Sequence, residues 1–233
     1  IVGYIGSKQA APFLLDGMSK LEYRGYDSAG IAVLEKGQVR VEKCVGRLDA
    51  LRQKLEGNMP ESVIGIGHTR WATHGRPSDR NSHPHTDGSG KFVVVHNGII
   101  ENYLALKEEL IAKGVEFSSD TDTEVVAHLM ADLFDGDMES TVKKVLKVIK
   151  GSYSLVFMCE AEQDKIICTK KDNPLVIGLG EGENFIASDI PAIINHTRRT
   201  FIMSDGEIAT VTKDGVWVQD IEGTPINKKV FEV

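Results

Sequence analysis

The sequence is poor in cysteine, and its cysteines follow no pattern. Only Cys44, Cys159 and Cys168 occur in 233 residues, with no CxxC or CxxH spacing. An odd number without such a spacing favours a reducing, cytoplasmic setting. Cys159 and Cys168 lie in apolar, strand-like stretches, and this position is typical of buried core thiols.

Long hydrophobic runs and an excess of basic charge are also missing. No apolar run approaches the 18 residues or so of a membrane-spanning helix, and no signal peptide is visible. The formal net charge is -7, which argues against a partner with a phosphate backbone. We therefore expect neither a membrane nor a nucleic acid as a partner.

The apolar pattern that is present predicts one domain, because no repeat, low-complexity stretch or linker divides the chain. Helices are predicted at 9–22, 47–55, 101–113, 122–134 and 138–150. Strands are predicted at 1–6, 29–34, 38–44, 63–69, 91–96, 153–159, 164–169, 174–179, 184–188, 199–203, 207–211 and 216–218. Many hairpins and few βαβ units indicate an α+β fold with two largely antiparallel sheets. Thr121 and Glu124 match a capping box at the start of helix 122–134.

Four polar segments interrupt the apolar strands or lie at their ends. These segments are 23–27, 68–75, 96–98 and 119–124. Strand ends are where a rigid scaffold presents binding and catalytic side chains. The four segments are therefore the candidate site.

Arg70 and Asp122 could grip the two charged ends of an α-amino acid. Arg70 follows a buried strand, so a rigid guanidinium could bind a carboxylate with two parallel hydrogen bonds. Asp122 lies at a helix start, where the helix dipole keeps a carboxylate ionised and able to bind an ammonium. Each residue taken alone is better explained as an ordinary surface arginine or a helix-start carboxylate.

Asn97 and Gly98 end the predicted strand 91–96, where an amide and a backbone N–H could form an oxyanion hole. An Asn-Gly hairpin turn is the alternative, but the following residues lead into a helix and not a returning strand. Trp71 could equally be a core side chain or a pocket wall.

Five histidines cluster within 29 positions, which raises the hypothesis of a metal site. They are His68, His74, His83, His85 and His96. No HExxH motif or comparable spacing on a defined element is present, and His83 and His85 lie in a polar loop that we expect to be flexible. We therefore expect structural hydrogen bonds here and no metal.

Several stretches together resemble the glutaminase domain of the glutamine–fructose-6-phosphate aminotransferase (glucosamine-6-phosphate synthase) family. This family belongs to the class II, N-terminal-nucleophile amidotransferases. The resemblance covers essentially the whole chain, and its motifs agree in order and spacing. The matching stretches are 21–30, 68–75, 83–85, 94–102, 121–124, 174–180 and 183–189.

The resemblance implies a four-layer αββα sandwich that hydrolyses L-glutamine to L-glutamate and ammonia without a cofactor. Family members carry an N-terminal Cys-Gly directly before Ile-Val-Gly. The chain begins at Ile1 without a methionine, so we expect the nucleophilic cysteine upstream of Ile1, with its own α-amino group as the base.

Site roles also follow from the resemblance, residue by residue. It implies that Asn97 and Gly98 form the oxyanion hole, while Arg70 binds the substrate carboxylate and Asp122 the ammonium. Three residues match the loop that closes over glutamine, namely Trp71, Thr73 and His74. Arg24 and Gly25 match the segment beside the nucleophile.

The resemblance further implies a partner for this chain. It predicts that residues 1–233 are one glutaminase domain, and that ammonia passes to a sugar isomerase domain of a homo-oligomeric parent enzyme. That domain, which this chain lacks, would aminate fructose 6-phosphate to glucosamine 6-phosphate. The alternatives are the glutaminase half of another amidotransferase, such as one feeding phosphoribosyl pyrophosphate, and a glutamine-binding regulatory module without a nucleophile.

Overall fold

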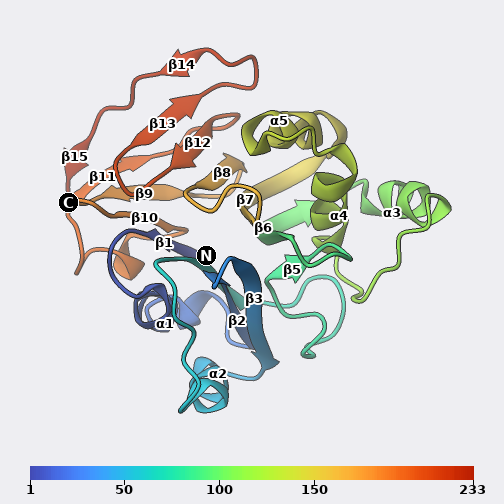
Figure 1. Cartoon of the computed structure of the whole chain (residues 1–233), viewed down its shortest axis with the longest axis horizontal. Helices are drawn as coiled ribbons and strands as arrows, with labels where there is room; N and C mark the ends of the chain where they lie inside the picture. The colour runs from blue at the N-terminus through green and yellow to red at the C-terminus, as the bar shows by residue number, and fades with distance from the viewer.

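Two β-sheets stack face to face, and helices cover the outer face of each (Figure 1). The computed structural model describes all 233 residues. The ladders within both sheets are antiparallel. The predicted α+β class and the four-layer αββα architecture are therefore confirmed. No helix combines the length and apolar character needed to cross a membrane.

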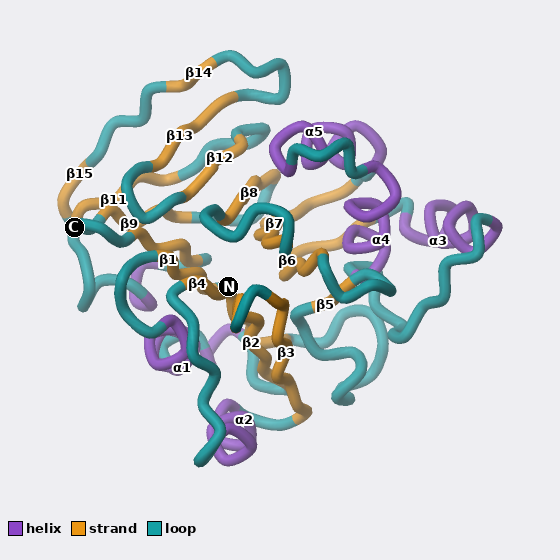
Figure 2. The backbone as a smooth tube through the Cα atoms, viewed as in Figure 1, coloured by secondary structure: helices purple, strands orange, loops and turns teal.

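The two sheets have eight and seven strands (Figure 2). In spatial order, the first sheet contains β15 (Phe231–Glu232), β11 (Arg199–Ile202), β9 (Val176–Leu179), β10 (Asn184–Ala187), β1 (Val2–Ile5), β4 (Ile64–Arg70), β2 (Ser28–Glu35) and β3 (Gln38–Val45). The second contains β14 (Pro225–Ile226), β13 (Val216–Gln219), β12 (Ile208–Val211), β8 (Ile166–Lys171), β7 (Gly151–Cys159), β6 (Phe92–Ile100) and β5 (His85–Thr86).

The helices divide between the two outer faces, as Figure 2 shows. The first sheet is covered by α1 (Ala10–Ser19) and α2 (Leu48–Leu55). The second is covered by α3 (Tyr103–Ala112), α4 (Glu124–Leu133) and α5 (Met138–Val148). Two short 3-10 turns, Glu22–Arg24 and Ile190–Ala192, complete the elements. The five predicted helices are all present, each between one and four residues shorter than predicted.

Strand β4 explains how the sequence places polar side chains between the sheets. Its isoleucines, Ile64 and Ile66, belong to the apolar core between the two sheets. A Cβ on Gly65 would meet Leu14 of α1, so the intervening glycines let that helix approach the outer face. Because side chains alternate along a strand, His68 and Arg70 continue the inner face beyond Ile66.

The sequence prediction is wrong at β6 and at the start of α4. Strand β6 does not end at His96 but stays paired with β7 through Ile100, because Gly98 adopts a φ of 118° that other residues rarely reach. The capping box is also absent, since the N-cap of α4 is Thr123 and makes no side-chain hydrogen bond. The carboxylate of Glu124 instead accepts hydrogen bonds from the Ser118 and Ser119 backbone and from His128.

Candidate active site

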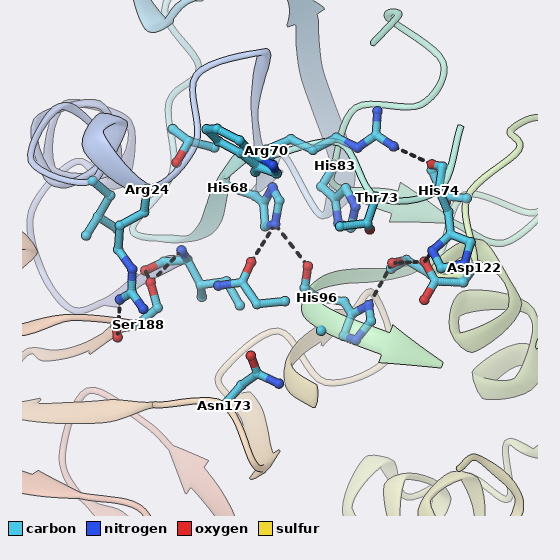
Figure 3. A pocket seen from close by; sticks show the side chains of 18 residues that line it. Arg24, His68, Arg70, Thr73, His74, His83, His96, Asp122, Asn173 and Ser188 are labelled. Carbon is cyan, nitrogen blue, oxygen red and sulfur yellow. Dashed lines mark hydrogen bonds and ion pairs between the residues drawn. The ribbon is translucent and has the colours of Figure 1, made fainter. Parts of the chain in front are cut away.

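A pocket of about 240 Å³ lies beyond the apolar core, where β4 of one sheet approaches β6 of the other (Figure 3). With the exception of Gly25, it is lined by the residues that the sequence nominated: Arg24, Arg70, Trp71, Thr73, His74, Asn97, Gly98 and Asp122. The lining is mostly polar, and its residues come from segments that are far apart in the chain. The fold therefore brings the four polar segments together.

Arg70 is buried, and its guanidinium holds the loop that follows β4. One terminal nitrogen donates to the carbonyl oxygens of His74 and Gly75, the latter at 2.9 Å, and the other donates to Arg76 at 3.4 Å. In Figure 3 the Arg70 side chain extends to this loop at one edge of the pocket. Burial lowers the pKa of Arg70, while the nearby carboxylates of Asp27 and Asp122 oppose that shift. The guanidinium therefore stays charged and shapes the loop at the same time.

Asp122 is also buried, two residues before the start of α4. Its Oδ2 accepts a hydrogen bond of 2.7 Å from the backbone N–H of Ile100, at the end of β6. Its Oδ1 lies 3.8 Å from Nδ1 of His74. One oxygen is thus anchored to the sheet, while the other accepts only a long hydrogen bond of 3.5 Å from the Thr123 hydroxyl and faces the loop that Arg70 holds.

Asn97 and Gly98 lie on the β6 side of the pocket. The Asn97 Oδ1 lies 2.9 Å from Nε2 of His68. A Cβ on Gly98 would come within 2.3 Å of the Ser152 carbonyl oxygen, so its positive φ and the close approach of β7 both require glycine. The positive φ of Gly98 therefore belongs to a paired strand that lines the pocket and not to a hairpin turn.

Arg24 lines the opposite side of the pocket, beside the first residue of the chain. Its guanidinium donates to the Ser188 carbonyl at 3.1 Å and lies 3.6 Å from the Asp189 carboxylate. The Ile1 nitrogen donates to the Ser188 Oγ at 3.0 Å. Burial, and secondarily the charge of Arg24, lower the pKa of this amine to about 5. Any residue joined to Ile1 would extend from this nitrogen at the pocket wall.

Gly25 serves packing and does not line the pocket. A Cβ at this position would come within 2.8 Å of the Arg70 backbone carbon. The segment 24–25 can therefore lie directly against the end of β4. The Asp27 N–H donates to the Arg70 carbonyl at 3.1 Å, which fixes the same contact.

The histidines form a buried group under the pocket and not a flexible loop. His83 stacks on His68 with ring centroids 4.0 Å apart, and His85 meets His83 edge-on at 4.7 Å. Burial holds the pKa of His68, His83 and His85 well below the usual range. His96 is also buried, with Nδ1 2.8 Å from the Thr123 hydroxyl, and burial lowers its pKa. Neutral imidazole rings therefore line the base of the pocket.

Trp71 is not a core residue, since 61% of its surface is exposed. Its ring meets Tyr26 edge-on with centroids 5.5 Å apart, at the rim of the pocket. Two polar lining residues, Asn173 and Ser188, lie outside both the four polar segments and the histidine group that the sequence singled out. Ser188 falls within the matching stretch 183–189, which gave a signal, whereas Asn173 merely precedes a proline between two strands.

Two solved structures of enzymes match this chain over most of its length. A glutamine phosphoribosylpyrophosphate amidotransferase from B. subtilis aligns with 94% of this chain and 48% of its own, with 26% identity and a TM-score of 0.82. An allosteric regulatory enzyme of purine biosynthesis aligns over the same shares with 25% identity and a TM-score of 0.83. The fold is thus of the N-terminal-nucleophile amidotransferase type.

Sequence comparison gives the family. The family described as glutamine amidotransferase domain matches residues 68–195, which is more than half of the chain. The chain therefore belongs to the glutamine amidotransferase domain family. The matched span begins at His68 and includes the loop after β4, the Asn97-Gly98 bend and Asp122.

Relatives that match the whole chain or nearly all of it carry one name. The chain is 55% identical over its full length to a glutamine–fructose-6-phosphate aminotransferase (isomerizing) of Caldanaerobacter subterraneus subsp. tengcongensis, and 52% identical to the protein of that name from Clostridium tetani. The identity to the Aquifex aeolicus protein is 52% over 99% of the chain. The chain spans 38% to 39% of the length of these relatives.

Proposed function

We propose that this chain is a glutaminase domain, 1–233, that hydrolyses L-glutamine to L-glutamate and ammonia with a cysteine joined ahead of Ile1. One observation carries the proposal. A single pocket is lined by the buried guanidinium of Arg70, the buried carboxylate of Asp122, the Asn97 amide beside Gly98, and Ile1. Free glutamine has a carboxylate, an ammonium and a carboxamide. Each of these groups has a chemical counterpart in the pocket.

The proposed roles follow from this complementarity. Arg70 attracts the substrate carboxylate and Asp122 its ammonium, while His74, Trp71 and Thr73 belong to the loop that encloses the amino acid. The cysteine sulfur attacks the carboxamide carbon, and the electrons of the C=O bond move onto its oxygen. The Asn97 amide and the Gly98 N–H stabilise that oxyanion. The C=O bond re-forms as the C–N bond breaks, and the leaving nitrogen departs as ammonia with the proton that the cysteine amine took from the thiol. Water then hydrolyses the thioester, which releases glutamate and restores the thiol.

Arg24 and Gly25 support the nucleophile in this scheme. Arg24 is bonded to the Ser188 carbonyl, and the Ser188 hydroxyl accepts from the Ile1 nitrogen. The free α-amino group of the cysteine would be the base for its own thiol. This chemistry needs no cofactor.

We further propose that the ammonia is delivered to fructose 6-phosphate by a sugar isomerase part of a homo-oligomeric parent. The support is the name shared by relatives that are 50% identical or more over the whole chain. The identity to the solved phosphoribosylpyrophosphate enzyme is only 26%, so that branch is the less favoured alternative. Three free cysteines, two of them buried, agree with a cytoplasmic setting.

The deciding experiment compares the chain carrying Cys-Gly ahead of Ile1 with a matched chain carrying Ser-Gly. Both should bind glutamine in calorimetry, and only the cysteine form should release ammonia steadily. Glutamine binding without turnover in both forms would favour the regulatory module. An absence of binding in both would refute the proposal.

A further inference from the structure

We propose that His68 is a positioning residue that orients the Asn97 side chain so that its NH₂ group faces the substrate. This inference rests on the proposed function, in which Asn97 donates to the oxyanion. His68 belongs to β4 of the first sheet and Asn97 to β6 of the second. The contact between them therefore ties the two sheets together at the pocket.

The orientation follows from a hydrogen bond that has only one possible direction. Nε2 of His68 lies 2.9 Å from the His96 carbonyl oxygen and 2.9 Å from Oδ1 of Asn97 (Figure 3). A backbone carbonyl can only accept a hydrogen bond. Nε2 of His68 must therefore carry the proton. An NH₂ group turned toward it would then oppose donor to donor.

The other ring nitrogen supports the same assignment. Nδ1 of His68 has no hydrogen-bond partner, and the side chain is 3% exposed. A proton on that nitrogen would be a buried donor without an acceptor, which is costly. Burial also lowers the pKa of His68 well below the usual range. The ring is thus neutral with one N–H, on the nitrogen that faces Asn97.

The His68 ring is itself held in place by the segment around His83. The two rings stack with an interplanar angle of 12°. A Cβ on Gly30, the β2 partner of His68, would lie 2.0 Å from the His83 carbonyl oxygen. Glycine at this position therefore lets the segment lie flat on the sheet. The Lys43 ammonium fixes it further by donating to the Ser82 and Pro84 carbonyls at 2.7 and 3.0 Å.

The consequence for the reaction is specific. Without the His68 N–H, the Asn97 amide is free to rotate and can present its oxygen to the developing oxyanion, which repels it. Removing one oxyanion donor lowers kcat by roughly 100- to 1,000-fold. A donor that is misoriented for part of the time should cost less, and we expect a loss of about 10- to 100-fold. Glutamine binding, which depends on Arg70 and Asp122, should change little.

The kinetic test uses the chain with Cys-Gly ahead of Ile1 and three variants. We expect His68→Leu to lower kcat by about 10- to 100-fold with KM within roughly threefold. His68→Gln, whose amide can again donate to Asn97, should recover most of that loss. His196→Gln, outside the pocket, should match the parent. An unchanged kcat in His68→Leu, or equal losses in Leu and Gln variants of equal thermal stability, would overturn the inference.

A second measurement does not depend on turnover. Long-range proton–nitrogen correlation spectra should place the His68 proton on Nε2. The Asn97 amide signals should shift or broaden in His68→Leu and return in His68→Gln. A proton on Nδ1, or unmoved Asn97 signals, would contradict the proposal even if the enzyme is active. Normal spectra with no ammonia release would instead contradict the proposed function and leave the assignment of His68 intact.

Discussion

The same two sheets enclose two kinds of interior, one apolar and one polar. The apolar core between them contains residues such as Ile66, Val95 and Ile177, all fully buried. The pocket end contains His68, Arg70 and Asp122, which are each only 3% exposed. The side chains named in both regions are buried, yet their contacts differ in kind.

The difference lies in what each kind of contact depends on. Burial of apolar surface is non-directional and roughly proportional to area, so a core residue can be exchanged for another of similar volume. A buried imidazole or carboxylate depends on where each donor and acceptor points. We therefore expect core changes to alter stability alone, and changes at the polar end to alter chemistry and pH response.

The largest expected effect is on the stability of the apolar region. Ile177→Ala, in β9 away from the pocket, should lower the free energy of unfolding by about 3 kcal/mol, because it removes buried methyl groups and leaves a cavity. Urea denaturation measures the loss, and kcat for glutamine should stay within about twofold. Ile202→Ala is the matched control on the neighbouring strand. Ile202 is 51% exposed, and its loss should cost no more than about 0.5 kcal/mol.

Equal destabilisation by the two alanine variants would show that burial between the sheets does not set the cost. A large fall in kcat for Ile177→Ala would remove the separation between the two regions.

Asp122→Asn is the corresponding change at the polar end. The asparagine oxygen can still accept from the Ile100 N–H, so the fold is kept, but the charge that faces the substrate ammonium is lost. A hydrogen bond to a charged group is worth about 1.5 to 3 kcal/mol. We expect KM for glutamine to rise by roughly 10- to 100-fold, with a smaller fall in kcat. Steady-state ammonia release measures both.

Asp214→Asn, an exposed aspartate outside the pocket, should leave both constants unchanged. If KM rises equally in the two variants, Asp122 does not grip the substrate.

Part of the site could be predicted because the side chains of β4 alternate clearly between the two faces of the sheet. The alternation of isoleucine and glycine from Ile64 to Gly67 marks one face for the core and one for a close helix. The same alternation carries His68 and Arg70 onto the inner face. The polar segments at strand ends were enough to predict Arg70, Asn97, Gly98 and Asp122, whereas Arg24, Thr73 and His74 came from the family resemblance.

The remaining parts depend on contacts that no local pattern encodes. Strand β6 continues past Asn97 only because Gly98 can take a positive φ beside β7. Glu124 makes no capping box because its carboxylate accepts hydrogen bonds from His128 and from the Ser118 and Ser119 backbone, so a different set of local contacts replaces the expected one. The stacking of His83 on His68 requires a glycine at position 30, because a Cβ there would collide with the carbonyl oxygen of His83, more than fifty residues further along the chain. The contacts at Gly98 and Gly30 are long-range packing, which the local sequence pattern does not contain.

The smallest predicted effect is a dependence of the free energy of unfolding on pH, which we expect from the polar end and not from the apolar core. The pKa of His68, His83 and His85 lies well below the usual range because burial disfavours the charged ring. In the unfolded chain these rings take up protons below about pH 6.5. The unfolded state then binds more protons than the folded state, so stability falls as pH falls. Each histidine should contribute a loss of about 1 kcal/mol between about pH 6.5 and 5.5.

Urea unfolding of the parent and of His68→Gln at several pH values tests this directly. The glutamine variant lacks one titrating ring, so its stability should depend less steeply on pH in this window. Ile177→Ala should lower stability by the same amount at every pH, because no titratable group is changed. Carboxylates such as Glu124, whose pKa is lowered, act only below about pH 4.5 and leave the window clear. Identical slopes for the parent and His68→Gln would mean that the polar end tolerates a charged ring, and the contrast between the two interiors would not hold.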